Sequence, residues 1–399
     1  MPGDGTKLAT TKHNAPGARL LDLTRLMRRA GHVLTGVDRV ELAYLRAVLS
    51  APEPAFGLIR SRLGYILLGS DGMTALLPAL SGMGADQSDA EADAVWRLAR
   101  RHAIARVPPF LLRRALRRHL PASSVYLNVG HSNLTERVLS SMSALGIRIT
   151  VFVHDVIPLE FPEFQREGSV EPFRAMLGRV CRFADAVIYN SNDTRQRAEA
   201  CAPGKLPVSI VAHLGTELQS ARPDELPHNL PPAAPYFVCI GTIEPRKNHA
   251  FLLDLWAEMG PDAPNLVLAG RRGWRNDAVF DRLDALDPAG PVIEAAGLTD
   301  GALAALIDGS AGVLFPSHAE GFGLPAVEAA SRGVPVVVNT LDVFREILGD
   351  IPIYASVSDR YLWINTINAL AQTGRNVPNA QTDALPTWEA HFKTVLTLT

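Results

Sequence analysis

Cysteine is scarce in this chain, which has three in 399 residues. Cys181, Cys201 and Cys239 stand far apart, and their spacing matches no metal-binding or redox pair. This pattern excludes a disulfide framework, so we expect small buried thiols in a reducing cytoplasm.

Long apolar runs and an excess of one charge are also missing. No run reaches the roughly 18 apolar residues of a membrane span, and residues 1–17 lack the apolar core of a signal peptide. The formal net charge of −2 excludes a general attraction to nucleic acid or to anionic lipid. We therefore expect a cytoplasmic protein that is soluble or peripheral to a membrane.

The chain does have enough apolar residues for two cores. It is 47% hydrophobic and 20% charged, and its length suits two domains. Apolar runs of strand length alternate with segments of helical length in both halves. This alternation predicts an α/β protein with two Rossmann-like, doubly wound domains and a ligand cleft between them.

The first domain is expected over residues 1–216. It opens with a strand, a glycine turn and a helix that runs to about residue 48. Residues 56–70 favour a hairpin, and residues 81–94 favour a polar, acidic insertion. Eight arginines between Trp96 and Leu120 alternate with apolar residues and favour a helical region. Expected strands are 18–23, 125–129, 147–153, 186–189 and 208–214, and expected helices are 133–145, 170–183 and 193–200.

A linker is expected over residues 217–235, which are polar, rich in proline and without periodicity. The second domain then covers residues 236–386. Its expected strands are 236–240, 266–269, 292–295, 312–315, 334–338 and 353–355. The last segment, residues 387–396, is amphipathic.

Two glutamates bracket a helix start in the second domain. In the stretch from Glu320 to Glu328, Pro325 suits the first turn of a helix, and Gly321 and Gly323 let the backbone approach a ligand closely. A loop after a parallel strand lies where α/β proteins bind ligands, and the amides of a helix start can hold a phosphate. Either glutamate alone can simply complement the helix dipole or be solvated, but the pair indicates a sugar or ribose site.

A second anion site is expected where residues 237–241 lead into Thr-Ile-Glu-Pro-Arg-Lys-Asn. Arg246 and Lys247 stand between a strand and an expected helix at 249–259, where they can neutralise a diphosphate. Asn248 can cap that helix. Each cation alone can be merely solvated, but the two together at this position favour ligand binding.

Three further segments carry candidate residues. His154 and Asp155 follow the strand at 147–153. A histidine in an apolar setting is often only structural, but a place at the sheet edge favours function. Gly36, before a helix, and Gly270, after a strand, let the backbone meet a ligand. Trp274 can border that ligand or pack the two domains together.

These motifs resemble those of the retaining glycosyltransferases of family 4, which have the GT-B fold. Residues 320–328 resemble the family's E-x7-E signature, residues 241–248 its G-x-x-E-P-R-K-N motif, and residues 154–158 its H-D-x-x-P motif. In that family the first Glu contacts the donor sugar, the second Glu the ribose, the Lys the diphosphate, and the His lies near sugar and acceptor. The resemblance implies catalytic roles for His154, Asp155 and Glu320, and donor binding by Gly36, Gly241, Thr242, Arg246, Lys247, Gly270, Gly321, Phe322, Gly323, Leu324 and Glu328.

The resemblance leaves two points open. Many members carry an arginine directly after the glycine of the second motif, where this chain has Thr242, so Arg246 can be the substitute. Asp155 either orients the imidazole of His154 or stabilises positive charge that develops on the sugar.

The string Thr-Gly-Val-Asp-Arg-Val at 35–40, together with these motifs, looks most like bacterial mannosyl- or rhamnosyl-type transferases of surface-polysaccharide assembly. This implies transfer of a hexose from a nucleotide-diphosphate sugar, with GDP-mannose expected, to a glycan or lipid-linked acceptor. No metal or other cofactor is expected. In GT-B enzymes the final helix returns to the first domain, so residues 387–399 are expected to pack there. The alternatives are a sugar-nucleotide epimerase or hydrolase and a non-catalytic nucleotide-sugar scaffold.

The arginine-rich region Arg97–Arg118 has two interpretations. It can dock on anionic lipid at the inner face of the membrane, which the lipid-linked acceptors of relatives favour, or it can be a solvated helix face. No aromatic platform or recognition motif accompanies these arginines, so nucleic acid is not an expected partner.

Overall fold

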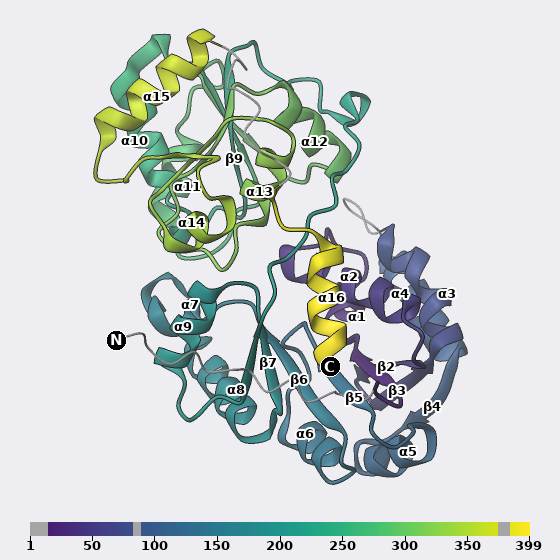
Figure 1. Cartoon of the computed structure of the whole chain (residues 1–399). Coiled ribbons are helices and arrows are strands. Elements are labelled where there is room, and N and C mark those ends of the chain that lie inside the picture. Colours follow the sequence, from purple (N-terminus) through teal and green to yellow (C-terminus); the bar gives the residue numbers. More distant parts are fainter. Residues whose placement is uncertain (1–14, 83–88, 374–383) are drawn as a thin grey trace, which may run out of the picture.

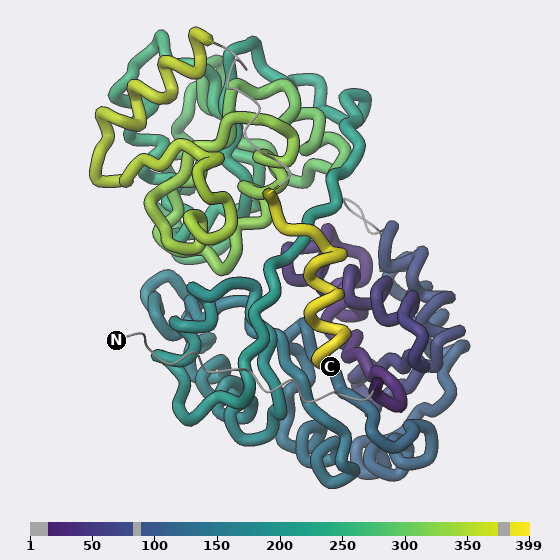
Figure 2. The backbone as a smooth tube through the Cα atoms, viewed as in Figure 1, coloured from purple at the N-terminus to yellow at the C-terminus, as the bar shows by residue number. Residues whose placement is uncertain are grey.

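The computed structural model describes residues 15–82, 89–373 and 384–399. Two α/β domains face each other, and the chain passes between them in the middle of the sequence and again near its end (Figure 1). The tube in Figure 2 shows the yellow C-terminal segment leaving the second domain and lying along the first. The expected pair of Rossmann-like domains is thus confirmed.

The first domain contains an eight-stranded sheet with the order β4-β3-β2-β1-β5-β6-β7-β8. All neighbours pair in parallel except β2–β3 and β3–β4, which are antiparallel, so β2 and β3 form the expected hairpin. The strands are β1 (Arg19–Asp22), β2 (Ala55–Ser61), β3 (Gly64–Gly69), β4 (Ala103–Val107), β5 (Val125–Asn128), β6 (Arg148–Val153), β7 (Ala186–Tyr189) and β8 (Val208–Val211). The helices are α1 (Thr24–Arg28), α2 (Gly36–Ser50), α3 (Ser70–Ser81), α4 (Asp89–Arg101), α5 (Leu112–His119), α6 (Glu136–Ser143), α7 (Ile157–Glu160), α8 (Val170–Phe183) and α9 (Asn192–Cys201).

The second domain contains a six-stranded parallel sheet with the order β11-β10-β9-β12-β13-β14. The chain turns from one half of the sheet to the other between β9 and β12, and α/β sheets bind ligands at such a switch point. The strands are β9 (Tyr236–Ile240), β10 (Asn265–Ala269), β11 (Val292–Ala295), β12 (Gly312–Phe315), β13 (Val336–Val338) and β14 (Ile353–Tyr354). The helices are α10 (His249–Met259), α11 (Asp277–Asp284), α12 (Asp300–Gly309), α13 (Leu324–Ser331), α14 (Asp342–Leu348) and α15 (Arg360–Thr373). The last helix of the chain is α16 (Trp388–Leu398).

The central strands are continuous apolar runs in the sequence because they are buried on both faces of the sheet. Every residue of β9 and of β12 is buried, as expected for parallel strands covered by helices on both faces. Phe237 of β9 lies edge-on to Trp256 of α10, with the ring centroids 6.4 Å apart.

The last helix, α16, packs on the first domain through His391. Its Nδ1 lies 3.1 Å from the carbonyl oxygen of His213, and its Nε2 lies 2.9 Å from the hydroxyl of Tyr44 in α2. A carbonyl can only accept, so Nδ1 donates and Nε2 accepts the Tyr44 proton. Burial lowers the pKa of His391 to about 4, which keeps this ring neutral.

The prediction of a helical region between Trp96 and Leu120 is wrong for residues 103–107, which form a strand. Helix α4 ends at Arg101, and the next residues form β4, where Ile66 pairs with Arg106 and Tyr65 with Val107. Side chains along β4 alternate between partly buried and exposed, which is the period of a strand. The arginines of this region therefore sit on a helix, an edge strand and a second helix, α5.

Two smaller expectations also need correction. The acidic insertion expected at 81–94 is partly helical, because residues 89–94 belong to α4, while residues 83–88 lie outside the described residues. The helix expected at 133–145 begins only at Glu136. Asn133 has a φ of 63°, which a right-handed helix does not allow, and Thr135 caps the helix by accepting from the amide of Val138.

Within residues 15–82, 89–373 and 384–399, no helix has both the length and the apolar character needed to cross a membrane. All three cysteines are free thiols; Cys239 is buried, and Cys181 and Cys201 are partly buried.

Candidate active site

A cavity of about 520 Å³ lies between the two domains, where the carboxyl ends of strands from both sheets meet. The loop after β6 and the start of α2 contribute from the first domain, and the loops after β9 and β12 contribute from the second. The expected site residues that line it are Gly36, His154, Asp155, Thr242, Arg246, Lys247, Glu320, Gly321, Phe322, Gly323, Leu324 and Glu328.

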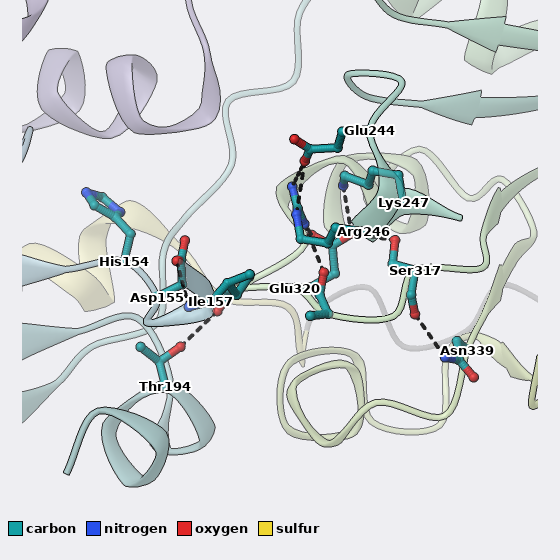
Figure 3. A network of polar contacts seen from close by, with 12 residues as sticks. His154, Asp155, Ile157, Thr194, Glu244, Arg246, Lys247, Ser317, Glu320 and Asn339 are labelled. Atoms are coloured by element: carbon teal, nitrogen blue, oxygen red, sulfur yellow. Dashed lines mark hydrogen bonds and ion pairs between the residues drawn. The ribbon is translucent and has the colours of Figure 1, made fainter. Parts of the chain in front are cut away.

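A buried ion-pair cluster forms where β9 and β12 end (Figure 3). Glu320 accepts from Nζ of Lys247 at 2.7 Å through Oε1 and from Nη1 of Arg246 at 2.8 Å through Oε2. The Ser317 hydroxyl donates to the same Oε1 at 2.7 Å. Burial alone would raise the pKa of Glu320, but the two cations outweigh it and lower the pKa to about 2. Glu320 is therefore a carboxylate throughout the physiological range.

Gly241 explains how Lys247 reaches this position. A Cβ on Gly241 would lie 3.2 Å from Cε of Lys247, and Gly241 has a φ of 136°, which side chains rarely adopt. The glycine thus makes room for the lysine stem and does not itself line the cavity.

Arg246 is held by two carboxylates. Besides Glu320, it donates from Nε and Nη2 to Oε1 of Glu244 at 3.0 and 2.6 Å, and from Nη1 to the carbonyl of Ala319 at 2.9 Å. Four of its five N–H groups are thereby used. Arg246 ties the loops after β9 and β12 together, which leaves Lys247 as the less occupied cation. Glu244, buried beside it, is a site residue to which the sequence had given no role.

Asn248 does not cap α10 with its side chain, contrary to expectation. Its backbone is left-handed, with a φ of 57°, and its Nδ2 donates to the carbonyl of Pro316 at 3.2 Å. A left-handed residue aims its side chain away from the helix amides, so Asn248 joins the β9 loop to the β12 loop instead.

Glu328 of the second domain forms an ion pair with Arg39 of the first domain. Nη1 of Arg39 lies 3.1 Å from Oε1 of Glu328, and Nη2 of the same arginine pairs with Asp300. Burial raises the pKa of Glu328, and Arg39 opposes this rise. Arg39 is the second site residue whose role the sequence did not reveal. The only available signal was its place in the Thr-Gly-Val-Asp-Arg string at the start of α2.

The start of α2 is built by a capping box. The Thr35 amide donates to Oδ2 of Asp38 at 2.7 Å, and Asp38 is fully buried and paired with Arg25. The box presents Gly36 to the cavity, where a Cβ would lie 3.5 Å from Cδ1 of Leu324 in the second domain.

His154 is a neutral acceptor at the cavity wall. Its Nε2 lies 2.7 Å from the carbonyl of Val129 and therefore carries the proton, and its ring stacks on Phe152 with centroids 4.3 Å apart. Burial lowers the pKa of His154 well below its ordinary value, and the neighbouring His131 adds to this effect. The remaining ring nitrogen, Nδ1, has a lone pair that can accept a hydroxyl proton.

Asp155 does not orient His154, because Val129 holds that ring. Oδ1 of Asp155 instead accepts from the amide of Ile157, the first residue of α7, at 3.2 Å. Burial raises the pKa of Asp155, and Arg246 opposes the rise across the cavity. Of its two considered roles, only the electrostatic one fits this geometry.

The remaining expected residues divide between cavity and packing. Gly270 does not line the cavity, and a Cβ there would lie 1.8 Å from the carbonyl oxygen of Gly241, so this glycine serves packing. Gly321 meets the first domain, where a Cβ would lie 2.8 Å from the carbonyl oxygen of His154. Gly323 has a φ of 85° and starts α13, and Thr242 is exposed in the cavity.

Direct contacts hold the two domains together around the cavity. The Thr194 hydroxyl donates to the carbonyl of Gly321 at 3.0 Å, and Nε1 of Trp274 donates to the carbonyl of Phe164 at 2.9 Å. Glu346 accepts from the amides of Asn192 and Asp193 at 2.6 and 2.9 Å. Trp274 therefore packs the domains together, and it also lines the cavity.

Most of the second domain matches a known protein family. Residues 223–352 match the family model of the glycosyl transferases group 1. The chain is 33% identical over 229 residues to the serotype-specific mannosyltransferase WbdA of Escherichia coli, a match that covers 52% of this chain and 28% of WbdA. It is 34% identical over 127 residues to the O-antigen chain mannosyltransferase B of Escherichia coli, covering 31% of this chain and 33% of that protein. The matches thus span about a third or less of these relatives.

Solved structures resemble the whole chain. Anabaena HepE in complex with UDP superimposes with a TM-score of 0.64 at 17% identity, covering 96% of this chain and 99% of HepE. Sucrose-phosphate synthase of Thermosynechococcus elongatus gives a TM-score of 0.62 at 16% identity, covering 96% of both chains. At this identity the likeness concerns the fold alone, which is GT-B. The chain thus has a two-domain GT-B fold, and its residues 223–352 match the model of the glycosyl transferases group 1.

Proposed function

We propose that this protein is a retaining glycosyltransferase of family 4 that moves mannose from GDP-mannose to a glycan or lipid-linked acceptor in the synthesis of a bacterial surface polysaccharide. The observation that carries the proposal is the buried contact between Lys247 and Glu320 at the switch point of the second sheet, opposite His154. The names of the matched relatives, which are mannosyltransferases, support mannose as the sugar.

The site chemistry suits transfer from a nucleotide diphosphate sugar. When the bond between sugar and diphosphate breaks, negative charge grows on the diphosphate and positive charge on the sugar. Lys247 and the amides at the start of α13 are fixed positive groups that stabilise the leaving diphosphate. The carboxylates of Glu320 and Asp155 are negative groups, and they stabilise the positive charge that grows on the sugar.

Hydrogen-bond roles follow from the protonation states. Glu320 is ionised and accepts from sugar hydroxyls, and Nδ1 of His154 accepts from a hydroxyl of the sugar or acceptor. Glu328 can hold the two ribose hydroxyls once Arg39 releases it. Because these protein groups supply the charge, the proposal includes no metal ion or other cofactor.

Location and acceptor belong to the same proposal. A lipid-linked acceptor places the enzyme at the inner face of the membrane, with the region Arg97–Arg118 near anionic headgroups. Phe110, between α4 and α5, is 76% exposed and gives this surface an apolar side chain that can enter the lipid interface.

Two other functions remain distinguishable from this one. An epimerase or hydrolase of the same fold would convert the donor without an acceptor, and a scaffold would bind the donor without converting it. The presence of Lys247, Glu320, Glu328 and His154 in one cavity favours an enzyme over a scaffold.

A donor screen tests the proposal. Ligand-observed NMR with GDP-mannose, UDP-glucose and TDP-rhamnose should show binding of GDP-mannose and its loss in Lys247→Ala. Incubation with mannosyl acceptors should then give an α-linked product, as retention requires. Preference for a uridine or thymidine donor would overturn GDP-mannose, and donor turnover that needs no acceptor would overturn transfer.

A further inference from the structure

A second and larger cavity, of about 1240 Å³, opens in the first domain and shares no lining residue with the donor cavity. Helices α1 and α4, the β2–β3 hairpin and the end of β4 form its walls. Its charged lining residues are Arg28, Arg60, Arg62, Arg100, Arg106 and one acid, Asp93, and we call these six residues the arginine groove.

The arginines of the groove lack the partners that other arginines of the site have. Arg39 and Arg246 each hold two carboxylates, whereas no ion pair involves any groove arginine among the described residues. Nη1 of Arg60 is even buried without a hydrogen-bond partner. Since five positive charges face one negative charge in a concave site, the groove attracts an anion.

The geometry of the groove favours a phosphate group over a neutral ligand. The Arg60 guanidinium lies over the Tyr65 ring at 4.8 Å, and the Arg100 guanidinium lies over the Trp96 ring at 5.8 Å. Stacking of this kind restrains planar guanidinium groups, whose N–H forks match phosphate oxygens. Several such forks around one hollow suit a group with many acceptor oxygens, as in a diphosphate.

Topology places the groove on the same sheet edge as the donor cavity. Strands β1 and β2 are parallel, with Asp22 opposite Leu58, so the segments that follow them leave at one edge. Helix α1 connects the two cavities. Arg28 lines the groove, while Arg25 donates to the hydroxyl of Thr35, which lines the donor cavity, at 3.1 Å.

We propose that the arginine groove binds the phosphate or diphosphate group of the acceptor, whose sugar end then reaches the donor cavity along this edge. This inference rests on the proposed transferase function. Leu63, at the tip of the β2–β3 hairpin, lines the groove and is 84% exposed, which adds an apolar contact for an acceptor that carries a lipid chain. The arginines line a hollow, which fits a group that enters better than it fits a flat bilayer surface.

Two charge-reversal pairs test the groove in the full-length protein. Arg62→Glu with Arg106→Glu changes two exposed lining residues, and Arg101→Glu with Arg113→Glu changes two exposed arginines outside the groove by the same total charge. Binding of inorganic pyrophosphate, measured by calorimetry, should persist in Lys247→Ala, which removes the less occupied cation of the donor cavity. The lining pair should weaken this binding roughly tenfold or more, because charge-assisted hydrogen bonds are lost. The control pair should change it about twofold at most, since these two arginines do not line the cavity and exposed charges are screened.

Two results would overturn the proposal that the groove binds phosphate. One is the absence of pyrophosphate binding, and the other is equal weakening of that binding by both pairs. Vesicles of phosphatidylglycerol and phosphatidylcholine supply the second arm: if the protein binds these vesicles but not pyrophosphate, and both pairs reduce that binding equally, the arginines serve a bilayer surface instead.

Failure of the transferase proposal can be told apart from failure of the groove proposal. GDP-mannose binding, followed by ligand-observed NMR, should be the same in the lining pair and in the unaltered protein, because the groove is separate from the donor cavity. If the unaltered protein bound pyrophosphate in the groove but no nucleotide sugar, the transferase proposal would fail while the phosphate site stood. With both intact, the lining pair should raise the KM for a diphosphate-linked acceptor roughly tenfold relative to the control pair.

Discussion

The ammonium of Lys247 lies 2.7 Å from Oε1 of Glu320, although the two residues are 73 positions apart and follow different strands. The strands, β9 and β12, are neighbours in the sheet, so the loops that follow them converge. Lys247 is only 8% exposed and Glu320 only 5%. An ion pair this deeply buried loses most of its Coulomb energy to desolvation, so its role is better sought in ligand binding than in stability.

Glu320→Gln should cost both stability and activity. The amide keeps the shape of the side chain but leaves Lys247 buried without its counter-charge, for which we expect a loss of about 3 kcal/mol in the free energy of unfolding. Transfer should fall at least about 100-fold, because a fixed charge beside the reacting sugar is gone. Urea denaturation and a mannosyl-transfer assay measure the two effects.

The double variant Glu320→Gln/Lys247→Met separates these effects. It removes both charges, so the free energy of unfolding should recover in part while transfer stays low. Recovery of transfer in the double variant would show that this pair has no part in the reaction.

Acid should weaken the protein through Glu320. Its folded-state pKa is about 2, below the ordinary value of 4.5, so the unfolded chain binds more protons between these values. The stability that Glu320 contributes is therefore complete above about pH 4.5 and is lost as the pH falls toward about 2. The difference in unfolding free energy between the unaltered protein and Glu320→Gln should shrink across this window. A difference that stayed constant with pH would contradict the lowered pKa.

The convergence of the strand-end residues was predictable from the sequence. Apolar runs located β9 and β12, and parallel strands deliver their carboxyl ends to one edge, so Lys247 and Glu320 were expected at the same edge. His154 follows β6 for the same reason. The pattern of buried strands is strong because both faces of each strand are covered.

Contacts between domains were not predictable in the same way. Arg39 and Glu328 are 289 residues apart. Periodicity in the sequence does not show that the start of α2 will lie opposite α13. The contacts of Arg246 and Asn248 were not predictable either, because each depends on a loop that only the fold brings near. Strand β4 escaped notice because it is short, lies at the edge and is surrounded by arginines that suit a helix equally well.

Arg39→Ala should strengthen nucleotide binding. In the structure, Arg39 occupies Glu328, the residue proposed to hold the ribose, so the nucleotide must first displace it. Partly exposed ion pairs contribute roughly 0.2–1 kcal/mol, which predicts an affinity gain for GDP of up to about fivefold. Calorimetry measures the affinity. Arg46→Ala is the matched control, because Arg46 pairs with Glu217 and does not line the cavity.

Weaker GDP binding in Arg39→Ala, with Arg46→Ala unchanged, would contradict this view. Arg39 would then contact the nucleotide directly, and its pairing with Glu328 would belong to the empty site alone.

Thr242→Arg should raise the affinity for a nucleoside diphosphate. Thr242 is exposed in the cavity at the position where the family pattern often has arginine, and Arg246 cannot fully replace that cation because Glu244 and Glu320 already hold it. A new arginine at 242 can add charge-assisted hydrogen bonds, for which we expect roughly tenfold tighter binding of GDP by calorimetry. Thr242→Gln controls for length without charge and should change affinity little. If arginine and glutamine had the same effect, then Lys247 and the amides of α13 would already neutralise the diphosphate, and the threonine would leave no deficit of positive charge.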